Sequence, residues 1–178
     1  MKQSNNAAPT ADIEQRIAER FKQISEYYDF SSFTLQGFIA WVGKKRGKAI
    51  EMTAWAMPAA IFGAWIEVED MDYIFYDEDA IPLHKAHIQL HELAHMLCGH
   101  ETIKATKETL ADILMGKFSA DNLLLRSTKS DQKEQEAELL TSLIQTQIHR
   151  HARFDELTRE ATADKEQQKL LVALGMLD

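Results

Sequence analysis

Hydrophobic residues recur at helical spacing near the N-terminus. Four apolar residues are separated by four, four and three positions: Ile13, Ile17, Phe21 and Ile24. This spacing predicts an amphipathic helix that ends near Tyr28, with Asp12 as a capping residue before it. A second helical pattern follows, for which Ser31 or Ser32 is the expected cap. Its apolar positions are Leu35, Phe38, Ile39 and Val42.

From Ala49 the pattern changes to an alternation of apolar and polar residues, which is the period of a β-strand. A first strand is predicted over residues 50–55, a second over 61–68 and a third over 72–76. The turn Glu69-Asp70-Met71-Asp72 between the last two predicts a hairpin. Together these segments predict a small, mainly antiparallel sheet of about three strands.

Helical spacing returns after Ile81-Pro82, and proline is favoured in the first turn of a helix. Gly99 is a suitable residue at the end of this helix. Further helices are predicted over residues 107–115, 130–151 and 163–174. The expected fold is therefore α+β, with the small sheet packed on the helix of residues 82–98 and on the other helices.

Length and composition favour one globular domain. The chain has 178 residues, of which 45% are hydrophobic and 27% are charged, so residues 1–178 suit a single domain. We expect a disordered lead-in over residues 1–10 and a helical extension over residues 152–178. The only cysteine, Cys98, fits a reducing compartment. No segment resembles a signal peptide or a membrane span, so a cytoplasmic protein without membrane contact is expected.

The formal net charge of −8 is concentrated in one region. Eight acids and no lysine or arginine lie between Ala49 and Asp79, whereas the rest of the chain is balanced. An acidic protein is a poor direct binder of nucleic acid, so no nucleic acid is expected as a partner. The region could attract a basic protein. A solvated rim of loops is the simpler interpretation.

The segment His91-Glu92-Leu93-Ala94-His95 contains the strongest chemical signal. Two histidines four residues apart lie on one face of a helix, so their imidazoles can converge on a zinc ion. Glu92 is placed to act as the general base toward a water at that ion. A motif with only three fixed residues also occurs by chance in many chains. Apolar neighbours and a later glutamate-rich helix make chance less favoured here.

The other histidines are assigned different positions. His87 is expected at the rim of the cleft and His84 farther away, because the helix rises along its axis with each residue. His100 is expected to interact with the dipole at the helix C-terminus. His149 and His151 are two residues apart on a helix, so they face apart and do not form a metal-binding pair.

Three glutamates on one predicted helix are candidates for the third zinc ligand: Glu134, Glu136 and Glu138. Glu134 and Glu138 share a face, and the small residues Ala137 and Thr141 continue the Glu134 stripe. Glu136 lies above a leucine stripe and is expected to be an exposed acid over the core. Glu134 is therefore favoured as ligand. Glu138 is placed to accept a hydrogen bond from a ligand histidine. A fully solvated face is the alternative.

The segment from His91 to His100, HELAHMLCGH, resembles the active-site segment of the ImmA/IrrE family of zinc metallopeptidases. Residues 134–138, EQEAE, are similar to the E-x-x-A-(D/N) segment of that family. The resemblance covers roughly residues 30–150. It implies zinc as cofactor and points to Glu134 as the third ligand. Ala94 stands where the family usually has glycine.

Together, the motif and the resemblance predict a zinc-dependent endopeptidase with His91, His95 and Glu134 as ligands and Glu92 as base. The resemblance implies that the substrate is a helix-turn-helix repressor or an antitoxin, which would be a basic DNA-binding protein. Two alternatives are a toxin–antitoxin component and a zinc-stabilised protein that sequesters a regulator without cleaving it. Glu92 favours catalysis, because a purely structural zinc site needs no base.

Overall fold

The computed structural model describes residues 8–57, 61–115 and 130–173, and the side chains of residues 11–57, 61–115, 130–153 and 156 among them. The helices are α1 (Ala8–Tyr27), the 3₁₀ turn η1 (Phe30–Ser32), α2 (Leu35–Arg46), α3 (Pro82–Cys98), α4 (Lys107–Leu114) and α6 (Asp131–Ala173). The strands are β1 (Ala49–Trp55), β2 (Gly63–Val68), β3 (Met71–Asp77) and β4 (Ile103–Ala105). The predicted α+β class is confirmed.

The sheet has four strands in the order β1-β3-β2-β4. The predicted hairpin of β2 and β3 is present, with Glu69 and Asp70 in its turn. However, β1 pairs with β3 in parallel and β2 pairs with β4 in parallel, so the expectation of a mainly antiparallel sheet of about three strands was wrong. Alternation identifies a strand but not its partner, and β4 is too short to show an alternating pattern.

The helix boundaries differ from the prediction at three points. α1 begins at Ala8, so it includes part of the segment expected to be disordered, and residues 1–7 lie outside the described part of the chain. Thr34, rather than Ser31 or Ser32, caps α2, because its hydroxyl accepts a hydrogen bond from the Gly37 N–H at 3.0 Å. α6 is one continuous helix that covers both of the predicted C-terminal helices.

The main core lies between the helices and one face of the sheet. Trp65 and Ile74 of the sheet pack there with buried residues of α1, α2, α3 and α6. The other sheet face carries Ile66, Val68 and Phe75, which pack with Leu110 of α4. Both faces of the sheet are therefore covered with apolar side chains.

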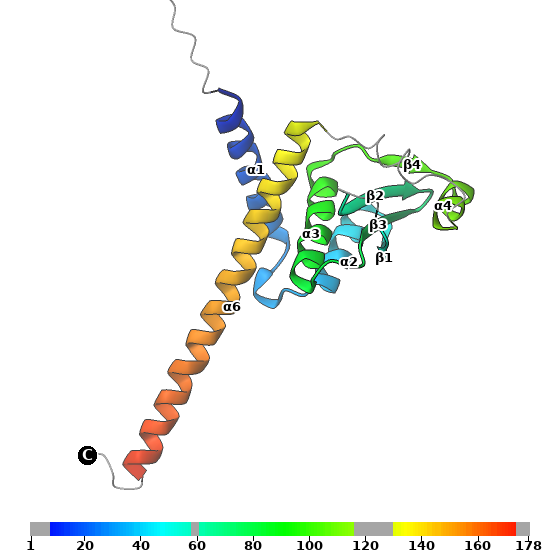
Figure 1. Ribbon diagram of the computed structural model, residues 1–178. Helices are drawn as coiled ribbons and strands as arrows, with labels where there is room; N and C mark the ends of the chain where they lie inside the picture. The colour runs from blue at the N-terminus through cyan, green and yellow to red at the C-terminus, as the bar shows by residue number, and fades with distance from the viewer. Residues whose placement is uncertain (1–7, 58–60, 116–129, 174–178) are drawn as a thin grey trace, which may run out of the picture.

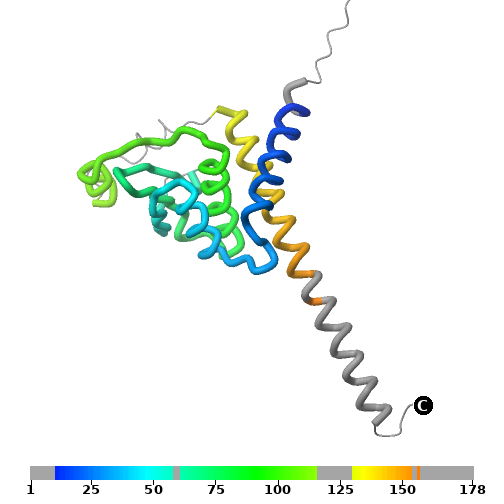
Figure 2. Tube along the Cα trace, turned by 180° about the vertical axis from the view of Figure 1, so that it is seen from behind, coloured from blue at the N-terminus to red at the C-terminus, as the bar shows by residue number. Residues whose placement is uncertain are grey.

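Helix α3 lies between the sheet and α6, and α1 runs alongside the N-terminal part of α6 (Figure 1, Figure 2). Ala137 and Thr141 of α6 are fully buried, as their stripe predicted. Small side chains at these positions let α6 approach α3 closely. This approach brings a carboxylate-rich turn of α6 beside the histidines of α3.

Candidate metal centre

The two motif histidines converge near the C-terminal end of α3. Pro82 stands in the first turn of this helix, and Gly99 ends it in the left-handed conformation with φ of 73°. The Nε2 atoms of His91 and His95 lie 3.1 Å apart. His95 is fully buried, whereas the His91 side chain is 19% exposed. The helical spacing of the motif therefore gives one buried and one partly open imidazole.

Glu134 of α6 completes a group of three converging donor atoms. Its Oε2 lies 3.2 Å from His91 Nε2, and its Oε1 lies 3.4 Å from His95 Nε2. The structure thus brings Glu134 to both histidines, as the rotation of the helix predicted. Its role as a ligand stays a prediction.

The spacing of the ligand atoms of these three residues suits a tetrahedral ion. In a zinc site with bonds of about 2.0–2.1 Å, neighbouring ligand atoms lie about 3.3 Å apart. Here the two histidine nitrogens are 3.1 Å apart, and the two oxygens of Glu134 lie 3.2 Å from the His91 nitrogen and 3.4 Å from the His95 nitrogen, respectively. Two imidazole nitrogens and one carboxylate are also a donor set that zinc accepts, and they leave a fourth position for a water or a substrate. His91, His95 and Glu134 are therefore a suitable set of ligands for the zinc ion that the sequence predicts.

Glu92 is buried on α3 and lies against the first residue of β2. A Cβ added to Gly63 would be 3.2 Å from Glu92 Oε1 and 2.5 Å from Ile88 Cγ2. Glycine at position 63 therefore allows α3 to pack tightly under β2. The carboxylate next to a ligand histidine is consequently held between the helix and the sheet. This position is consistent with its predicted role as base, and that role stays a prediction.

Glu138 and His87 form a second, more open group with His91. Glu138 Oε2 lies 3.4 Å from His91 Nδ1 and 3.4 Å from His87 Nε2, and the Glu138 side chain is 57% exposed. These three residues could also hold an ion. Both groups can be filled at once only if His91 bridges two ions through both of its nitrogens, which requires an imidazolate. Glu138 thus lies near His91 Nδ1, and its role as a hydrogen-bond acceptor for a ligand histidine stays a prediction.

His100 and Glu136 contact each other behind His95, and the position of Glu136 differs from the prediction. His100 is buried just after the end of α3, and its Nδ1 lies 2.8 Å from His95 Nδ1. Its Nε2 lies 3.0 Å from Oε2 of Glu136, whose side chain is only 14% exposed. Glu136 was expected to be an exposed acid, so that interpretation was wrong. The left-handed Gly99 turns the chain back, and the His100 N–H donates to His95 O at 3.1 Å.

The surroundings of Glu136 favour its charged form. Burial alone would raise the pKa of Glu136. Hydrogen bonds from His100 and Gln132, together with the positive charge of Arg16, outweigh burial and hold this pKa below its usual value. Arg16 Nη2 lies 2.9 Å from Glu136 Oε1. The sequence contained one signal for the contact between His100 and His95, because a glycine at a helix end returns the next residue onto the last turn.

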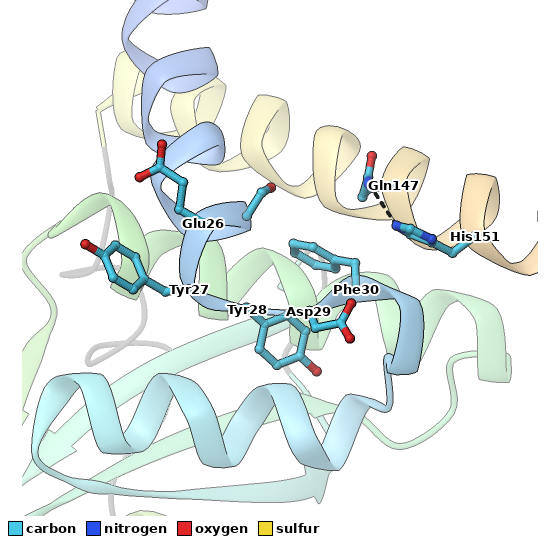
Figure 3. Close-up of a pocket in the computed structure, with 8 residues that line it drawn as sticks. Glu26, Tyr27, Tyr28, Asp29, Phe30, Gln147 and His151 are labelled. Carbon is cyan, nitrogen blue, oxygen red and sulfur yellow. Dashed lines mark hydrogen bonds between the residues drawn. The ribbon is translucent and has the colours of Figure 1, made fainter.

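Two of the hollows outside the group of converging atoms are lined by histidines. One, of about 400 Å³, is lined by Ile81, Leu83, His84, His87, Gln145 and His149. The other, of about 340 Å³, lies between the end of α1 and α6, where Gln147 Nε2 approaches His151 Nε2 at 3.0 Å (Figure 3). His149 and His151 thus line different hollows. The groups of metal-capable side chains found among the described residues both lie at His91 instead.

The acidic region is partly neutralised by basic residues from elsewhere in the chain. Asp72 is fully buried, accepts a hydrogen bond from Trp65 Nε1 at 2.8 Å and pairs with Arg46 at 2.7 Å. Glu67 pairs with Lys48 at 3.1 Å. Glu69 and Lys107 also form an ion pair, at 2.5 Å. Asp72 is therefore a core residue and does not belong to a solvated rim.

Comparisons with known proteins identify no relative: no family model, no curated protein and no solved structure matches this chain. Among the described helices, none has the length and apolar character needed to cross a membrane. The functional argument therefore rests on the geometry of the site.

Proposed function

We propose that this protein is a zinc-dependent endopeptidase. The observation that carries this proposal is the convergence of His91, His95 and Glu134, whose donor atoms are 3.1 to 3.4 Å apart. The buried carboxylate of Glu92 is adjacent in sequence to the first of these residues. A site that only stabilises the fold has no use for an acid at that position.

In this proposal, His91, His95 and Glu134 hold the ion. Zinc bound there would supply Lewis-acid chemistry, which acidifies water and polarises the scissile carbonyl. Glu92 accepts the proton of the attacking water and then delivers it to the amine that leaves. The packing of Glu92 against Gly63 restricts its carboxylate, so the base is oriented before the substrate arrives.

An extended peptide substrate fits the N-terminal end of β2. β4 pairs only with Ile66–Val68, and the Thr102 hydroxyl donates to Trp65 O just before this pairing. In the described part of the chain, Gly63 and Ala64 pair with β3 on one side and with no strand on the other. A peptide could add there by backbone hydrogen bonds, next to Glu92.

The substrate that we propose is a basic, DNA-binding repressor or antitoxin. The support is the resemblance of the two motifs and the acidic residues of positions 49–79. Ion pairs within the chain already involve Glu67, Glu69 and Asp72, so the charge available to attract a basic partner is smaller than the sequence suggests. The alternatives of a toxin component and of a sequestering protein are outcomes of the test below.

The test compares the zinc-loaded wild type with Glu92→Gln. Each is incubated with lysate from the producing cells, and newly formed protein N-termini are counted by mass spectrometry. We expect Glu92→Gln to keep its zinc and to lose cleavage on the order of 10² to 10⁴-fold, because loss of a general base has effects of this size. Addition of a chelator to the wild type serves as the matched control for loss of metal.

Two results would overturn the proposal. One is cleavage by Glu92→Gln at the wild-type rate with equal zinc content. The other is a wild type that carries zinc but creates no new N-termini. Retention of an intact DNA-binding protein by that wild type would then identify a sequestering protein.

A further inference from the structure

Four side chains from three parts of the chain form a continuous series behind the buried ligand histidine. Arg16 of α1 contacts Glu136 of α6 at 2.9 Å, and Glu136 contacts His100 Nε2 at 3.0 Å. His100 Nδ1 then contacts His95 Nδ1 at 2.8 Å. The Nε2 atom of His95, on the other side of the ring, faces His91 and Glu134.

The direction of the hydrogen bonds follows from the acid at the end of the series. Arg16 and Gln132 both donate to Oε1 of Glu136, and a carboxylate can only accept. His100 therefore donates from Nε2 and, as a neutral imidazole, accepts at Nδ1. His95 must then carry its proton on Nδ1. Its Nε2 keeps a lone pair, which is the form that a metal ion requires.

Burial makes this series effective. His95 is fully buried, His100 is nearly so, and water competes little for their ring nitrogens. Hydrogen bonds to a charged acceptor in such surroundings are stronger and more directional than those at the surface. The ring plane of His95 is consequently set by contacts that lie outside the group of donor atoms.

We propose that Glu136 and His100 are positioning residues that fix the tautomer and the orientation of His95 for metal binding, and that Arg16 holds Glu136 in place. The inference rests on the metal centre of the proposed function but not on proteolysis. In the usual arrangement, a carboxylate contacts the ligand histidine directly. Here the imidazole of His100 lies between the carboxylate of Glu136 and His95.

The test measures zinc affinity by competition with a chelating dye for the wild type, Glu136→Gln, His100→Ala and Arg16→Ala. Loss of an outer partner of a ligand histidine costs about 10- to 100-fold in metal affinity, and we expect this range for Glu136→Gln and His100→Ala. Arg16→Ala should have a smaller effect in the same direction. Asp131→Asn, which removes an exposed charge from the same helix, is the matched control and should bind zinc like the wild type.

A second readout follows the proton itself. Nitrogen NMR of the histidine side chains should show His95 protonated on Nδ1 in the wild type and a mixture of tautomers in His100→Ala. A role in packing alone would not change this signal. Thermal unfolding of the zinc-free proteins identifies variants that do not fold. If Glu136→Gln and His100→Ala do not fold, the zinc affinity of Arg16→Ala provides the test, because this variant truncates a half-exposed side chain.

The possible failures can be told apart. A wild type that binds no zinc would overturn the metal centre and this inference together. Folded variants with wild-type zinc affinity and an unchanged His95 tautomer would overturn the inference alone. Weakened zinc binding with a wild type that cleaves nothing would support the positioning role and reject the peptidase.

Discussion

The two histidines of the motif have unlike surroundings. On the buried side, His95 is fully enclosed and is backed by His100 and Glu136. On the open side, His91 is partly exposed, and its outer partner Glu138 is more than half exposed at 3.4 Å. Both histidines come from the same helix, one turn apart. Their difference arises from what α6 and the segment after Gly99 place behind each ring.

This difference indicates a division of roles. The buried side holds one ligand in a fixed tautomer and orientation, because its hydrogen bonds are short and shielded from water. The open side is reached by solvent, because the side chains of His91 and Glu138 are 19% and 57% exposed. A site that binds a metal ion and still admits a substrate needs both properties. The predictions below test the contrast, beginning with the largest effect.

The largest expected effect belongs to Glu134, where the two sides meet. We expect Glu134→Ala to lose zinc during purification, because it removes one of three protein ligands. Glu138→Ala, one turn away on the same face, should weaken zinc binding by about 10-fold, the lower end for an outer partner, because its carboxylate is mostly solvated. Metal content and zinc affinity of the purified variants provide the measurement.

The same experiment can also show that the ion is bound on the open side and not on the buried side. If Glu138→Ala loses zinc while Glu134→Ala retains it, the ion occupies the group of His87, His91 and Glu138 instead. The buried side would then have no direct part in metal binding.

A smaller effect is expected at Gly63, where the sheet meets Glu92. In Gly63→Ala, the added Cβ collides with Ile88 Cγ2, and overpacking of this kind costs about 1 to 3 kcal/mol. The free energy of unfolding, measured with urea, should fall by this amount. Cleavage should fall further than stability explains, because the new methyl also presses on Glu92.

The matched control is the same change made together with Ile88→Ala, which removes the colliding methyl group. A cost of Gly63→Ala that is equal in both backgrounds would show that the helix and the strand are not in the close contact described here.

The last prediction concerns Cys98, which lies on the buried side near Arg20 and Glu136. Burial raises the pKa of this thiol to about 11, against the opposing charge of Arg20. At pH 8 the thiolate fraction is then about 100-fold lower than for an ordinary thiol, so iodoacetamide should label the folded chain about 100-fold more slowly than the urea-unfolded chain. Equal rates would show that the buried side is open to water.

The same shift has a consequence for stability. The thiol keeps its proton to higher pH in the folded chain than in the unfolded one, so its contribution to stability is complete below pH 9. That contribution is lost as the pH rises toward about 11. Cys98→Ser should remove this part of the pH dependence of urea unfolding. Because Cys98 is the only cysteine, the labelling signal has one source.

The sequence by itself determined the local structure and the donor atoms that meet. Helical spacing placed His91 and His95 on one face of α3, and small residues in the Glu134 stripe of α6 indicated which acid would approach them. Alternation located β2 and β3, and the turn between them predicted their hairpin. These features depend on neighbours within a few residues, which the chain order shows directly.

Only the tertiary structure decided the partners that are distant in sequence. Strand pairing made the sheet largely parallel, because alternation is the same for either direction. Glu136 was assigned to the surface because helical rotation describes one helix and not what packs upon it, and its contact with His100 comes from that packing. Arg16 is 120 residues from Glu136 in the sequence, and only the packing of α1 on α6 brings them together.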